Sequence, residues 1–193
     1  RVSDAGVPDS INVDASRFLV SLRQSSEDPG RIKIGGTLGC KNDCYLPEQG
    51  LDAAEAEQFH RWQCEQLAAG GVDFLVAATL PSVGEALGMA RAMAATGLPY
   101  FISFVIDRAG RIMDGSSLAD AFKYLDCEVG TPPLGYMVNC SYPTFLCAES
   151  QSDNVLNRLI GYSANASSLD HCELEGAEDI QSETVSDWGN QML

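Results

Sequence analysis

The sequence predicts an α/β fold built on a parallel sheet, and three features lead to this prediction. Near-continuous apolar runs, typical of strands that are buried on both faces, recur along the chain. Segments that begin with helix-capping residues separate these runs, so that strand and helix alternate at a spacing of roughly 30 residues. Polar or thiol side chains follow the runs, at the positions where parallel sheets carry functional groups. The 193 residues are expected to form a single domain, 1–193.

Five segments are expected to be strands. They are residues 31–40, 72–81, 98–105, 134–138 and 159–165. The fourth segment opens after a proline pair, is apolar throughout, and stops on the amide of Asn139 and the thiol of Cys140. On residue type alone, Cys140 reads as a small buried side chain, because free cysteine is among the most buried residue types.

Capping residues predict the helices that lie between the strands. Asp52 and Ser82 each precede a glutamate by three residues, which is the spacing of a capping box, and Ser117 begins a third helix in the same way. His60 falls in the middle of the first of these helices, on its apolar face. We interpret it as a hydrogen-bonded packing residue rather than a catalyst.

Two segments lie outside this alternation, and no chemistry is assigned to the first of them, residues 1–30. Before the first strand, Phe18, Leu19 and Leu22 have the helical spacing of a buried face. At the other end, residues 170–183 are rich in acidic side chains, and a solvated surface is the ordinary explanation of such a stretch.

The ends of the predicted strands define a candidate site. Right-handed crossovers bring the carboxyl ends of successive parallel strands to the same edge of a sheet. The side chains expected to face this common mouth are those of Cys40, Thr79, Ser103, Asn139, Cys140 and Asn165.

Composition excludes several classes of partner. The formal net charge of −15 argues against binding to nucleic acid or to an anionic membrane surface. No segment approaches the roughly 20 apolar residues of a membrane span. The seven cysteines are an odd number and lack the short spacings of a disulfide framework, so reduced thiols in a cytoplasmic protein are expected.

Met137-Val138-Asn139-Cys140, at the end of the fourth predicted strand, resembles the G-V-N-C motif of the homocysteine S-methyltransferase family. The other matching stretches, in the family's order, are Phe59-His60-Arg61, residues 71–81, Ile102-Ser103-Phe104 and Asp114-Gly115. Gly36-Thr37-Leu38-Gly39-Cys40 stands where similar families carry G-S-L-G-P and departs from it in two places.

The resemblance implies a fold, an activity and a set of site residues. The family consists of (β/α)8 TIM barrels, of which this chain would hold about five β/α units. Its members transfer a methyl group from a donor to the sulfur of homocysteine or a related thiol or selenol, on Zn²⁺. By this resemblance Cys140 is expected to be a zinc ligand. The expected substrate-binding residues are Gly36, Thr79, Ser103, Asn139 and Asn165.

The chain departs from the family pattern in three places. An adjacent cysteine pair in a G-G-C-C motif, which completes the family's zinc site, does not occur in the sequence, and neither does the family's opening D-G-G strand. We therefore expect the chain to be the middle of a longer barrel. In the family's A-E-T-I-P motif the glutamate is replaced by Ala78, so a charge-assisted hydrogen bond to a substrate amine would be lost.

These departures leave alternatives open. The chain is either a zinc-dependent methyltransferase barrel or a non-catalytic barrel of the same descent that serves as a binding or scaffold protein. A third reading, an unrelated enzyme with Cys140 as nucleophile, lacks an activating base, because His60 is mid-helix and His171 lies in the acidic tail. Cys40 and Cys44 are a further candidate pair of zinc ligands, although their strand should lie nearly opposite that of Cys140 across a barrel.

The expected partners are a small-molecule thiol and a methyl donor. An incomplete barrel also leaves strand edges unpaired, so a second copy of the chain or the missing barrel segments are expected to associate with it.

Overall fold

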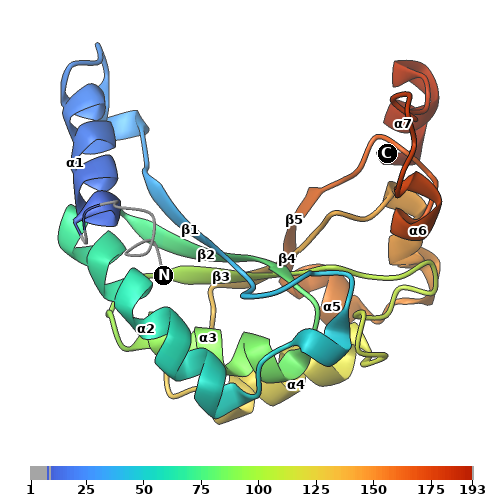
Figure 1. Cartoon of the computed structure of the whole chain (residues 1–193), viewed down its shortest axis with the longest axis horizontal. Helices are drawn as coiled ribbons and strands as arrows, with labels where there is room; N and C mark the ends of the chain where they lie inside the picture. Colours follow the sequence, from blue (N-terminus) through green and yellow to red (C-terminus); the bar gives the residue numbers. More distant parts are fainter. Residues whose placement is uncertain (1–7, 9, 193) are drawn as a thin grey trace.

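The computed structural model describes residue 8 and residues 10–192, and it consists of one parallel sheet covered by helices (Figure 1). The strands are β1 (Gly35–Gly39), β2 (Phe74–Leu80), β3 (Tyr100–Phe104), β4 (Gly135–Asn139) and β5 (Leu159–Ser163). The α-helices are α1 (Ile11–Gln24), α2 (Ala53–Gly70), α3 (Val83–Ala94), α4 (Leu118–Glu128), α5 (Asp153–Arg158), α6 (His171–Leu174) and α7 (Val185–Met192). Short 3₁₀ turns are η2 (Pro29–Arg31), η3 (Pro47–Gln49), η4 (Pro143–Leu146) and η5 (Ala148–Ser150).

The strands follow the order β1-β2-β3-β4-β5, and each pairs in parallel with the next. The prediction of five β/α units in a parallel α/β fold is therefore confirmed. The register places Asn139, the last residue of β4, opposite Ser163, the last residue of β5. The carboxyl ends of neighbouring strands thus meet at one edge.

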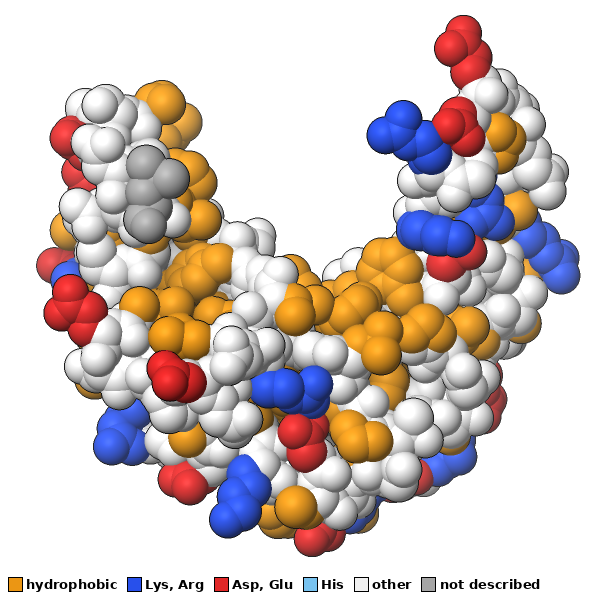
Figure 2. All heavy atoms as spheres, turned by 180° about the vertical axis from the view of Figure 1, so that it is seen from behind, with side chains coloured by type: hydrophobic (Ala, Val, Ile, Leu, Met, Phe, Trp, Pro, Cys, Tyr) orange, Lys and Arg blue, Asp and Glu red, His pale blue; other side chains and the backbone are white. Residues whose placement is uncertain are grey.

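The sheet curves, and its two faces differ. Helices α2, α3 and α4 cover the convex face, while the concave face lies open between two arms that carry α1 and α7 (Figure 1). In β2, Leu75 and Ala77 are completely buried against the helix layer, whereas Phe74 and Val76 are only partly covered. Hydrophobic side chains accordingly line the hollow between the arms in the space-filling view (Figure 2).

The predicted helix starts are confirmed by their capping bonds. The carboxylate of Asp52 accepts hydrogen bonds from the N–H groups of Ala54 and Glu55 at 2.9 Å, and Ser82 and Ser117 cap α3 and α4. No helix within residues 10–192 is long and apolar enough to cross a membrane.

The prediction that the apolar face of α1 is buried is wrong. The helix is present, but the side chains of Phe18, Leu19 and Leu22 are 61%, 45% and 52% exposed. The helix packs on α2 through Ser16 instead, and a Cβ atom at Gly70 would lie 2.4 Å from the Cβ of Ser16. Because two small residues allow this close approach, the apolar stripe of α1 turns away from α2.

One buried carboxylate joins α2, α3 and the loop after β1. Glu85 accepts hydrogen bonds from the N–H groups of Lys41 at 2.9 Å and Leu51 at 3.4 Å, and its Oε1 lies 3.2 Å from Nε2 of His60. Both side chains are buried. The packing role expected for His60 is confirmed.

The hydrogen bonds to Glu85 decide its protonation. Burial alone would raise the pKa of this carboxyl, but the bonds from His60 and from two backbone N–H groups outweigh that effect and hold the pKa below its ordinary value. The carboxylate is therefore ionised at neutral pH.

We expect Glu85→Ala to lower the free energy of unfolding by about 3 kcal/mol, because the change leaves His60 and two backbone N–H groups without their shared acceptor. Urea denaturation at pH 7 measures the loss. Glu65→Ala, at an exposed position of α2, is the control and should stay within about 0.5 kcal/mol of the wild type.

The pH dependence provides a second check. A carboxyl with a lowered folded-state pKa stabilises the fold above its unfolded-state pKa, and the stabilisation is lost as the pH falls through the folded-state pKa. The difference between wild type and Glu85→Ala should therefore shrink below the ordinary pKa of 4.5. A difference that persists unchanged at pH 3 would contradict an ionised Glu85.

Candidate active site

The side chain of Asn139 joins three strand ends. Its Oδ1 accepts hydrogen bonds from Oγ of Ser103 at 2.5 Å and from the N–H of Thr79 at 3.1 Å. Its Nδ2 donates to Sγ of Cys140 at 3.0 Å. The amide therefore uses both ends, and it fixes the direction of the Cys140 thiol relative to β2 and β3.

Two of these residues have left-handed backbones, with φ values of 59° at Thr79 and 52° at Cys140. Non-glycine residues adopt this conformation at a cost, and such positions cluster at functional sites. At Thr79 it coincides with a shift of register between β2 and β3. Sγ of Cys40 lies 3.7 Å from Oγ1 of Thr79, which adds a second thiol to the same edge.

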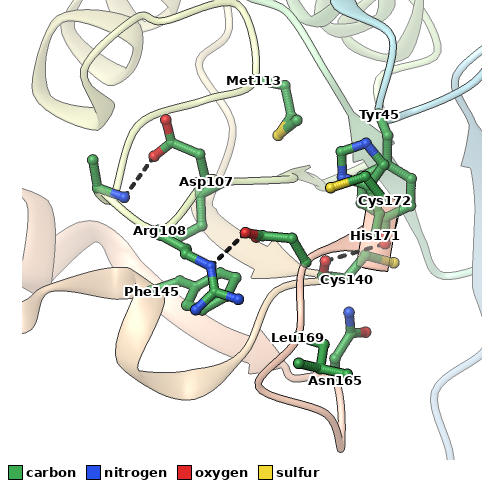
Figure 3. Close-up of a pocket in the computed structure, with 13 residues that line it drawn as sticks. Tyr45, Asp107, Arg108, Met113, Cys140, Phe145, Asn165, Leu169, His171 and Cys172 are labelled. Atoms are coloured by element: carbon green, nitrogen blue, oxygen red, sulfur yellow. Dashed lines mark hydrogen bonds and ion pairs between the residues drawn. The ribbon is translucent and has the colours of Figure 1, made fainter. Parts of the chain in front are cut away.

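A cavity of about 370 Å³ opens beside Cys140 (Figure 3). Cys140 and Asn165 contribute to its wall from the ends of β4 and β5, and Tyr45 contributes from the loop after β1. The hydroxyl of Tyr45 donates a hydrogen bond to the carbonyl oxygen of Cys140 at 3.3 Å. Met113 and Phe145 supply apolar lining.

The start of the acidic tail also contributes to this cavity, although most of its side chains from Cys172 onward are exposed, as predicted for a solvated surface. Leu169, Asp170, His171 and Cys172 all line the wall. The imidazole of His171 stacks on the ring of Tyr45, with the ring centroids 4.4 Å apart and the planes 4° from parallel. His171 is therefore in the same pocket as Cys140, contrary to the expectation from its position in the sequence.

Arg108 holds the tail in place. Its guanidinium donates hydrogen bonds to Asp170, to the carbonyl oxygen of Ser168 at 2.9 Å and to Glu173 at 3.0 Å. It also lies over the ring of Phe145, 4.9 Å from the centroid. Asp170, and to a smaller extent Glu173, raise the pKa of Arg108, so its guanidinium is permanently charged.

The thiols of the loop after β1 are held in the neutral form. Burial, with smaller contributions from the nearby Cys140 and Cys40 thiols, raises the pKa of Cys44 to about 12. Burial likewise raises the pKa of Cys40 and of Tyr45. None of these three groups supplies an anion at neutral pH in this arrangement.

The side chains around Cys140 can be compared with the ligands that a zinc site needs. Cys140 is of the right chemical type, because thiolate is a preferred zinc ligand, and it is partly exposed at the mouth. A zinc site needs three or four protein ligands, however. Within residues 10–192 no three His, Cys, Asp or Glu side chains lie close enough together to hold a metal ion. The described residues therefore do not form a zinc site by themselves, and this includes the candidate set of Cys40, Cys44 and Cys140.

The predicted zinc-ligating and substrate-binding residues are brought together with one exception. Thr79, Ser103, Asn139 and Cys140 share one network, and Asn165 donates its N–H to the carbonyl oxygen of Ser141 beside it. Gly36 lies apart, within β1. A Cβ atom at Gly36 would lie 3.0 Å from side-chain carbons of Leu67 and Leu75, so this glycine allows close packing of the helix layer. Substrate binding by any of these residues stays a prediction.

Three pocket residues were missed by the sequence analysis, namely Tyr45, Arg108 and His171. Tyr45 and Arg108 lie in loops that follow predicted strands, so the expectation that such loops form the mouth was a signal for both. No local pattern indicates that the acidic tail folds back over the pocket.

The geometry first defines a class: a parallel β/α barrel segment with a strand-end thiol in a pocket at the carboxyl edge of its sheet. Comparison with known families then identifies the family. The model of the homocysteine S-methyltransferase family matches residues 3–192, and the chain belongs to this family.

Solved structures agree with the fold. The metallated form of the homocysteine methyltransferase MmuM from Escherichia coli superposes with a TM-score of 0.64 at 18% identity, covering 84% of this chain and 70% of that one. The apo form gives a TM-score of 0.60 at 18% identity, covering 82% and 70%. No curated protein matches the chain. The predicted (β/α)8 TIM-barrel architecture, present here as five β/α units, is confirmed.

We expect Arg108→Gln to release the tail from the pocket, because the neutral side chain loses its charge-assisted bonds to Asp170 and Glu173. Hydrogen exchange at residues 170–174 should accelerate by roughly tenfold while exchange in β4 stays unchanged. Arg17→Gln, on an exposed face of α1, is the control and should leave both regions unaffected. Equal exchange at residues 170–174 in the two variants would contradict the claim that Arg108 holds the tail in place.

Proposed function

We propose that this chain forms part of the active site of a zinc-dependent methyltransferase, which transfers a methyl group to the sulfur of homocysteine or a related thiol or selenol. The observation that carries the proposal is the Cys140 thiol, held at the carboxyl end of β4 by Asn139 and open to a cavity of about 370 Å³. Family membership supports the reaction class. The unpaired cysteines support a cytoplasmic setting.

The residues present have distinct roles in this proposal. Cys140 contributes one thiolate ligand to zinc, and Asn139 orients it through the bonds to Ser103 and Thr79. Asn165 and Tyr45 shape the wall against which the acceptor thiol binds. Zinc, when bound, stabilises a sulfur ligand as thiolate. At least two further protein ligands must come from outside residues 10–192.

A non-catalytic binding protein is the second candidate. Ala78 favours it, because its methyl group cannot pair with the ammonium group of an amino-acid substrate as a glutamate would. Zinc content and methyl transfer together distinguish the two candidates.

We expect the full-length gene product to bind zinc and to methylate L-homocysteine from S-methylmethionine, S-adenosylmethionine or betaine, and its Cys140→Ser variant to lose both properties. Metal analysis by mass spectrometry and detection of methionine are the measurements. Methyl transfer should fall at least about 100-fold in Cys140→Ser, since one of the few ligands is removed.

Cys127→Ser is the matched control, because Cys127 is an exposed thiol on α4. It should retain zinc and activity. A folded wild-type protein with neither zinc nor methyl transfer would overturn the proposal and favour the binding protein.

We also propose that β1 and β5, which are the two edges of the sheet within the described residues, pair with a second copy or with further barrel strands. Unpaired edges of parallel strands expose N–H and C=O groups that bind other chains. Size-exclusion chromatography of the chain of 193 residues should show association. A sharp monomer peak with cooperative thermal unfolding would contradict this.

A further inference from the structure

We propose that His171 accepts the proton that the acceptor thiol loses during methyl transfer. This inference rests on the proposed function. It assigns a catalytic role to a side chain that the sequence analysis placed in a solvated tail.

The proposed reaction releases one proton. A thiol R–SH attacks the methyl carbon of a donor whose leaving atom is a positively charged sulfur or nitrogen. The S–CH₃ bond forms, the bond from the methyl carbon to the leaving atom breaks, and that electron pair returns to the leaving atom. The thiol proton must leave sulfur, since the thiolate is the nucleophile. A base inside the pocket can take this proton without releasing it to solvent.

His171 is positioned for this task. Its ring lies at the cavity wall that also includes Cys140 and Asn165 (Figure 3). The stack on Tyr45 involves the faces of both rings and leaves the edge of the imidazole, with its two nitrogen atoms, available. Histidine is the side chain that most often performs proton transfer near neutral pH.

Other polar groups of the cavity are already engaged or neutral. Oδ1 of Asp107 accepts the N–H groups of Ala109 at 2.9 Å and Arg111 at 3.0 Å. Asp170 is paired with Arg108. Burial raises the pKa of Tyr45, so its hydroxyl stays protonated and cannot serve as the base.

The surroundings compensate the positive charge that a proton would give to His171. Asp43, from the loop after β1, and Glu175, from the tail, line a second hollow that His171 also borders. Asp170 and Glu173 carry further negative charge, of which Arg108 neutralises part. The remaining titratable neighbours at the cavity are Tyr45, Asp107, Cys140 and Cys172.

Counting protons on binding tests the inference without any methyl transfer. L-homocysteine is titrated into the protein by calorimetry at pH 7, in buffers of different ionisation enthalpy. In the wild type the thiol proton moves to His171, and close to zero protons should appear in the buffer. In His171→Phe, which keeps a ring against Tyr45, about one proton per bound homocysteine should appear.

L-methionine is the control ligand, because it has no thiol proton, and it should release none from either protein. His171→Gln is the second variant and should behave as His171→Phe does. Cys127→Ser should match the wild type. Equal proton counts in the wild type and both His171 variants, with homocysteine bound in each, would overturn the inference while leaving the proposed function intact.

Activity gives a second readout. Removal of a general base typically lowers the rate by about 10²- to 10⁴-fold, and kcat should fall by this much in His171→Phe. The wild-type kcat should also decline on acidification, because a protonated imidazole cannot accept a proton, and this decline should be absent in His171→Phe. The same decline of kcat at low pH in the wild type and in His171→Phe would contradict the proposed role of His171. Failure of homocysteine to bind the wild type would instead overturn the proposed function, and this inference with it.

Discussion

Parallel pairing of β4 with both of its neighbours is the constraint on which the site depends. Because β3, β4 and β5 run in the same direction, Asn139 and Ser163 end their strands side by side, and Ser103, the last residue but one of β3, lies near the same edge. Only there can a single amide accept from Ser103 and donate to Cys140. A slip of β4 by one residue would turn Asn139 toward the helix layer and free the thiol. The position of Cys140 is thus set by the backbone hydrogen bonds of the sheet.

The buried carboxylate on the opposite side of the sheet contributes to the same site at a distance. Glu85 binds the N–H of Lys41, which begins the loop that carries Tyr45 into the pocket. Tyr45 in turn contacts the Cys140 carbonyl and the His171 ring. The strong bonds to an ionised, buried acceptor hold the start of this loop, so the helix layer and the pocket wall are mechanically connected.

The sequence was sufficient to predict the strands, the capped helices and the convergence of strand ends, because apolar periodicity and capping are local signals. Phe18 shows the limit of periodicity: its spacing indicates an apolar face, but the contact between Ser16 and Gly70 decides which face of α1 meets α2. His171 shows a second limit. Its place beside Cys140 depends on Arg108, far away in the sequence, and on a ring stack with Tyr45, and neither interaction leaves a local pattern.

Charge explains why one arginine has such influence on the pocket. The chain has 27 acidic and only 12 basic residues, so an acidic tail is repelled from most of the surface. Arg108 offers a local cation whose position is fixed against Phe145, and Asp170 and Glu173 converge on it from one turn of α6. A lysine there would retain the charge but not the fork that reaches both carboxylates and a backbone carbonyl. The geometry of the guanidinium, in addition to its charge, therefore places His171 at the mouth.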